Sequence, residues 1–136
     1  MLQNYPQEVL DAFLGAIQGE GKAFDALMTT LKCPELAALS NGINDDVEAQ
    51  MWLKVRVGMD WWLLCMAINY DESAIKKLQE KKGKFDVSFV LACHNRIEGK
   101  YWLAQHGYSH FLPICEAIIE TMKKRGWEQM LYKTFS

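Results

Sequence analysis

Cysteine and histidine side chains have the most distinctive chemistry in this chain. Thiolate and imidazole groups are the ligands that zinc prefers. Cys65, Cys93 and Cys115 lie in three successive apolar segments, and His94 or His110 could supply a fourth ligand. Their spacing matches no closed zinc motif, and the thiols stand where small buried hydrophobic residues are expected. We therefore predict no metal ligand and no cofactor, and we keep a metal-binding module built from these residues as an alternative.

Cys93 and His94 also suggest nucleophilic catalysis. Adjacent residues on a helix point about 100° apart, so this thiol and imidazole cannot share a hydrogen bond there. The sequence contains no G-x-S-x-G motif, no phosphate-binding loop and no dinucleotide-binding fingerprint. We therefore predict no catalytic residue. A small enzyme that uses Cys93, His94 and the neighbouring cysteines is the alternative.

Tryptophan residues provide the best candidates for a binding surface. Trp52 and Trp102 occupy equivalent positions of the repeat described below, and Lys77 holds that position in the unit between them. Trp61 and Trp62 are adjacent, so one helix face cannot bury both equally. Tryptophan is enriched at binding hot spots because it buries a large area at little conformational cost. We predict binding residues at Trp52, Trp62, Trp102 and Lys77, against the competing interpretation that Trp52 and Trp102 pack between units.

These residues are positioned by a pattern that recurs about every 25 residues. Its anchors are spaced by 26, 25 and 25 residues and each follows an alanine or glycine: Ile17, Ile43, Ile68 and Cys93. A second small residue stands six positions after each anchor, and a leucine stands ten positions after it. Such a period is typical of stacked units, because one unit is too small to bury its own apolar face.

Each unit has the pattern of two helices joined by a polar turn. The first helix is apolar, with Leu36, Leu39 and Ile43 at the i, i+3 and i+7 spacing of one helical face. The second helix is amphipathic, and in three units it ends at a glycine, the residue that most easily adopts the left-handed backbone conformation there. Because the first helices carry little charge beyond their start, we expect them to form the buried layer.

The turns and the small residues predict local contacts. Asp45 and Glu48 have the spacing of a helix N-cap and its third residue, and Asp71 or Ser73 could cap the second helix of the next unit. The alanines and glycines should let two helices approach closely. A larger side chain at these positions should cost about 1–3 kcal/mol.

The C-terminal region departs from the repeat. We expect a capping helix from Ile114 to Arg125 that Gly126 stops, after which residues 127–135 fold back.

Composition narrows the classes of partner. The chain has 136 residues, a net charge of −2 and 24% charged residues, so it suits one globular domain, and its net charge gives no electrostatic reason to expect a nucleic-acid ligand. No apolar run approaches the roughly 18 residues of a membrane span, and the N-terminal residues lack the pattern of a signal peptide. We predict a cytoplasmic protein with no nucleic-acid or membrane partner.

The period and the small-residue positions resemble those of α-solenoids, the class of stacked helix pairs. The T-P-L-H motif of ankyrin is absent, and the period is shorter than the about 34 residues of tetratricopeptide repeats. The units resemble short helical repeats in uncharacterised bacterial proteins, which implies no residue roles. The predicted fold is all-α: a single domain over residues 1–136, with a right-handed α-solenoid of repeats at 6–32, 33–58, 59–83 and 84–107 and a cap at 108–136.

The functional prediction therefore rests mainly on the predicted architecture. Repeat arrays present extended surfaces, so we predict a non-enzymatic scaffold that mediates protein–protein interaction or self-association. The enzyme or metal-binding module above is one alternative. A toxin-neutralising partner protein, suggested by small size and mild acidity, is another.

Overall fold

The computed structural model describes residues 1–81 and 83–135, with the backbone alone for residues 127–135. These residues form helices joined by short turns, with no strand among them, which confirms the all-α prediction. Among the described residues no helix is both long enough and apolar enough to cross a bilayer. Residues 82 and 136 of the predicted domain lie outside the described residues.

Eight of the helices form four consecutive pairs. The helices of these pairs are α1 (Gln7–Ile17) with α2 (Gly21–Met28), α3 (Pro34–Ile43) with α4 (Val47–Trp52), α5 (Met59–Ile68) with α6 (Glu72–Lys81), and α7 (Lys84–Cys93) with α8 (Ile97–Gln105). A π-helical turn, η2 (Leu53–Val57), continues α4. Single 3-10 turns, η1 (Leu2–Asn4) and η3 (Ser109–Phe111), precede α1 and the long last helix α9 (Leu112–Phe135).

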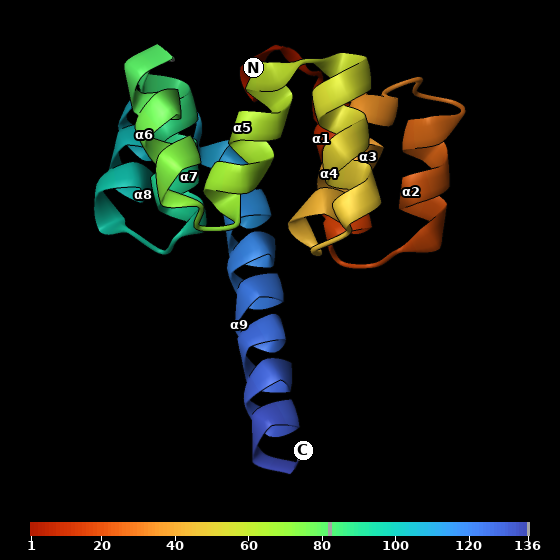
Figure 1. Cartoon of the computed structure of the whole chain (residues 1–136). Coiled ribbons are helices and arrows are strands. Elements are labelled where there is room, and N and C mark those ends of the chain that lie inside the picture. The colour runs from red at the N-terminus through yellow and green to blue at the C-terminus, as the bar shows by residue number, and fades with distance from the viewer. Residues whose placement is uncertain (82, 136) are drawn as a thin grey trace.

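The first helix of each pair lies on the inside. Helices α1, α3, α5 and α7 contact one another in chain order, and each also contacts its own second helix (Figure 1). Each of these four helices buries at least five residues, whereas α2, α4, α6 and α8 bury only one or two. The expectation that the first helices form the buried layer is confirmed.

The turns inside the four pairs share one backbone conformation. The second residue after each anchor has a positive φ, between 62° and 86°: Gly19, Asp45, Tyr70 and Asn95. The following N–H donates to the carbonyl five residues earlier, as from Glu20 to Gly15 at 2.9 Å and from Arg96 to Leu91 at 2.9 Å. This is the Schellman motif, which satisfies the last carbonyls of a helix. It ends the first helices at equivalent sites.

The capping prediction was right at one turn and wrong at another. Asp71 Oδ1 accepts the Ala74 N–H at 3.0 Å, one of the two caps expected in that unit. In the preceding unit Asp46 rather than Asp45 is the N-cap, because its Oδ1 accepts the Ala49 N–H at 3.1 Å. Asp45 is displaced from that role because it is the left-handed residue of the Schellman turn.

Close approach at the small residues is visible at two glycines. A Cβ on Gly99 of α8 would collide with the backbone of Ser88 and Ala92 in α7. A Cβ on Gly42 of α3 would lie 2.6 Å from the Cys65 Sγ of α5. These positions leave no room for a side chain, because Gly99 lies against the backbone of α7 and Gly42 lies against the Cys65 side chain.

The C-terminal helix does not stop at Gly126, contrary to the sequence-based expectation. Helix α9 runs without a break from Leu112 to Phe135, and the chain does not fold back. It contacts both α1 and α7 and then extends past the helix pairs (Figure 1). Glycine permits a helix to end but does not require it, and its cost inside a helix is only about 1 kcal/mol.

Candidate functional site

His94, the main catalytic candidate, holds a turn in place. Its Nε2 lies 2.9 Å from the Ala67 carbonyl and 3.2 Å from the Ile68 carbonyl, at the end of the preceding first helix α5. Because carbonyls only accept, Nε2 carries the proton. Burial lowers the pKa of His94, and the Tyr70 ring stacks on the imidazole at 3.8 Å. Asn69, the residue equivalent to His94 in the preceding helix pair, donates its Nδ2 to the Gly42 carbonyl at 3.0 Å. Each of these two side chains therefore caps the first helix of the pair before its own.

Arg125 of α9 extends this line of capping groups. Its Nη1 donates to the Ile43 carbonyl at 2.8 Å and to Asn69 Oδ1 at 2.7 Å, and its Nη2 lies 3.4 Å from the Asp45 carboxylate. A cation is favoured at a helix C-terminus because the helix dipole is negative there. Sequence reasoning missed Arg125, since nothing in the chain links it to partners 56 and 82 residues away.

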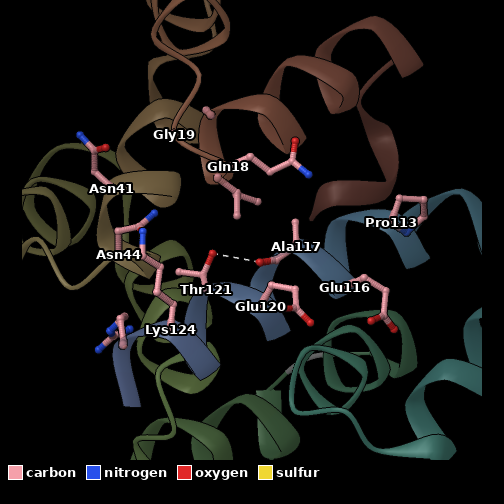
Figure 2. Close-up of a pocket in the computed structure, with 13 residues that line it drawn as sticks. Gln18, Gly19, Asn41, Asn44, Pro113, Glu116, Ala117, Glu120, Thr121 and Lys124 are labelled. Atoms are coloured by element: carbon pink, nitrogen blue, oxygen red, sulfur yellow. Dashed lines mark hydrogen bonds between the residues drawn. The ribbon is translucent and has the colours of Figure 1, made fainter. Parts of the chain in front are cut away.

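A groove of about 950 Å³ lies between the ends of α1 and α3 and the side of α9 (Figure 2). At this groove the series of caps between neighbouring first helices is interrupted. The Asn44 side chain donates to the Ser40 carbonyl of its own helix instead of to a carbonyl of α1. Gln18, Asn41 and Lys124 line it, and their side chains make no hydrogen bond or ion pair with any described residue. Thr121 donates back to Ala117 on α9. The groove also presents the Glu116 and Glu120 carboxylates and the Arg125 guanidinium, so its lining carries charges of both signs.

Three of the four thiols, those of Cys65, Cys93 and Cys115, are buried, whereas Cys33 is partly exposed. Burial raises the pKa of Cys65 to about 12. The pKa of Cys93 is raised well above its ordinary value by complete burial and by a hydrogen bond with Cys115. A thiol that stays protonated is a poor nucleophile and a poor metal ligand. Among the described residues no group of three or more His, Cys, Asp and Glu side chains is placed to hold a metal ion.

The four predicted binding residues lie on four different helices. Trp52 on α4 is exposed, and Trp62 on the adjacent α5 is half-buried with the Lys54 ammonium 4.4 Å from its ring centroid. Trp102 on α8 stacks against the His106 ring at 4.1 Å. Lys77 is exposed on α6. The structure thus places Trp52 and Trp62 on the contacting helices α4 and α5, Lys77 on α6, which pairs with α5, and Trp102 on α8 of the fourth pair.

Trp52 belongs to a segment rich in exposed apolar side chains, whose surface we call the α4–η2 face. Its exposed apolar residues are Val47, Met51, Trp52, Val55 and Val57, and Met59 follows at the start of α5. Val55 is 72% exposed and Trp52 is 39% exposed, although both are large apolar side chains. The opposite side of the same helix is buried through Leu53 and through Gln50, whose Nε2 donates to the Gly42 carbonyl at 2.9 Å.

The π-helical turn sets the geometry at the end of this face. The Gly58 N–H donates to the Leu53 carbonyl, five residues earlier, at 2.8 Å. Sequence reasoning identified Trp52 here but missed the valines. Their signal is the alternation Val55, Arg56, Val57, which puts valines on more than the buried side of a helix.

The described side chains therefore offer capped turns, a groove with both polar and apolar lining residues, and a run of exposed apolar side chains at α4 and η2. Comparison of the chain with known protein families, with curated protein sequences and with solved structures finds no match.

Proposed function

We propose that this protein is a non-enzymatic helical-repeat scaffold that binds another protein or a second copy of itself. Its architecture would be a right-handed α-solenoid of four helix pairs, with α9 as the C-terminal cap. The four Schellman turns support a repeat, since their left-handed residues are spaced by 26, 25 and 25 residues. So do the equivalent bonds from Asn69 and His94 to the preceding first helix.

The observation that carries the function is the concentration of exposed apolar side chains on the α4–η2 face. Of the ten large hydrophobic residues that are exposed among the described residues, six fall between positions 47 and 59. Burying apolar surface yields about 25 cal/mol per Å², so a partner that covers this face gains affinity. Single exposed apolar residues need no explanation, whereas a cluster marks an interaction site.

The alternatives have less support. An enzyme or metal module would use Cys93 and His94, but the thiol is buried and the imidazole caps α5. No described contact favours a toxin-neutralising role.

The test places a photoreactive amino acid at position 55 of the α4–η2 face, or at position 77 of α6, in the full chain within the cells that make it. We expect one discrete crosslinked species from position 55 and none from position 77, because only the first site is apolar. Met51→Glu should abolish that species. No adduct from position 55, or equal labelling from both positions, would reject the proposal.

A further inference from the structure

We propose that the partner of the α4–η2 face is a second copy of this chain, with the two helices antiparallel across a twofold axis near Met51. This inference rests on the proposed function and names its partner. A twofold interface uses the same surface on both copies, so the face must complement itself. Its charges and three of its exposed apolar residues meet that requirement.

The charges are arranged symmetrically about Met51. Acidic Asp46 and Glu48 stand at the start of the helix, and basic Lys54 and Arg56 stand near its end. Antiparallel pairing centred on Met51 brings Glu48 of one copy level with Lys54 of the other, and Asp46 level with Arg56. Parallel pairing would instead place like charges together, which costs free energy.

Three of the exposed apolar residues, Val47, Met51 and Val55, follow the same symmetry. Val47 of one copy lies level with Val55 of the other, and the two Met51 side chains meet at the axis. Methionine adapts its shape readily, which suits a position that must contact its own copy. Glu48 and Arg56 are exposed and make no ion pair with any described residue. They are therefore available to a second chain.

The first measurement is the mass of the full chain in solution, by light scattering and sedimentation over a dilution series. We expect twice the 15.7 kDa of one chain at high concentration. Met51→Glu should give monomer with an unchanged far-ultraviolet circular dichroism spectrum. Met28→Glu is the matched control, because Met28 on α2 is 47% exposed and Met51 is 48% exposed. That control should remain dimeric.

The second measurement tests the antiparallel register by charge reversal. Glu48→Lys should weaken the dimer on the order of tenfold at low salt, because two opposite-charge contacts become like-charge contacts. Adding Lys54→Glu in the same chain should restore the affinity, since the reversed charges again complement each other. Failure of the double variant to recover, while Met51→Glu still disrupts the dimer, would overturn the register.

The outcomes separate this inference from the proposed function. A wild-type chain that is monomeric at every concentration, or a dimer that survives Met51→Glu, overturns the self-pairing. If position 55 then crosslinks to a species other than a second copy, the scaffold function stands and its partner is a different protein. If position 55 crosslinks to nothing, the proposed function fails as well.

Discussion

Helices α4 and α6 occupy the same place in successive helix pairs, yet their outer surfaces are opposites. Both bury the leucine ten residues after the anchor, Leu53 beside α4 and Leu78 in α6. On the outside, at equivalent positions, α4 carries Trp52 and α6 carries Lys77, and both side chains are exposed. The packing of the pair constrains only the inner side of the second helix. The outer side is free to differ, so it is where a function specific to this chain can reside.

The largest expected effect comes from removing the buried leucine on the inner side of each of these two helices. Leu53→Ala and Leu78→Ala should each lower the free energy of unfolding by about 2–5 kcal/mol, because each leaves a cavity in a filled core. Urea denaturation measures both, with Lys77→Ala as the exposed control, expected to change stability by less than about 0.5 kcal/mol. A large loss for only one leucine would show that the two helices do not share an inner side.

A smaller difference should separate the turns that precede the two helices. Asn69→Ala should cost about 1–3 kcal/mol, because it removes a bond to the Gly42 carbonyl and the acceptor of Arg125. Asn44→Ala should cost about 0.5 kcal/mol or less, since Asn44 bonds only within its own helix and is exposed. Equal losses of unfolding free energy for the two variants in urea denaturation would contradict the role of Asn69 as a cap of the preceding first helix. Combining Asn69→Ala with Arg125→Ala should give less than the sum of the two losses.

Exchanging the outer residues sharpens the comparison further. Trp52→Lys gives α4 the residue type that α6 carries at the equivalent position 77. Folding stability should change by about 0.5 kcal/mol or less, while self-association weakens on the order of tenfold. Trp102→Lys should lower the melting temperature instead, because Trp102 packs on the core and stacks on His106. The assignment of Trp52 to a binding surface fails if Trp52→Lys destabilises the fold and leaves association unchanged.

The smallest effect concerns pH and extends the comparison to the turn before α8. Burial lowers the pKa of His94, so the unfolded chain binds a proton more readily than the folded one. The stability from the neutral imidazole is therefore fully present above the ordinary histidine pKa of about 6.5 and is lost as pH falls below it. His94→Asn, which copies Asn69, should flatten this decline in urea titrations at several pH values. A decline of the same size in the variant would exclude His94 as its source.

The inner structure could be predicted from the sequence because its signals are local. Leu36, Leu39 and Ile43 share one helical face, and Asp71 caps the helix three residues ahead of Ala74. Of the residues of the α4–η2 face only Trp52 was predicted, since composition draws attention to tryptophan. Val55 was missed because a valine among charged residues is equally compatible with a buried or an exposed helix face.

The amino-acid sequence alone determined the all-α class, the two-helix pattern of each unit and the burial of the first helices, because these follow from short-range periodicity and turn chemistry. Only the tertiary structure decided the course of α9, the contacts of Arg125 and the groove beside Asn44. These depend on which distant segments meet, and no local pattern encodes that. The same holds for the α4–η2 face, because exposure is a property of what the rest of the chain leaves uncovered.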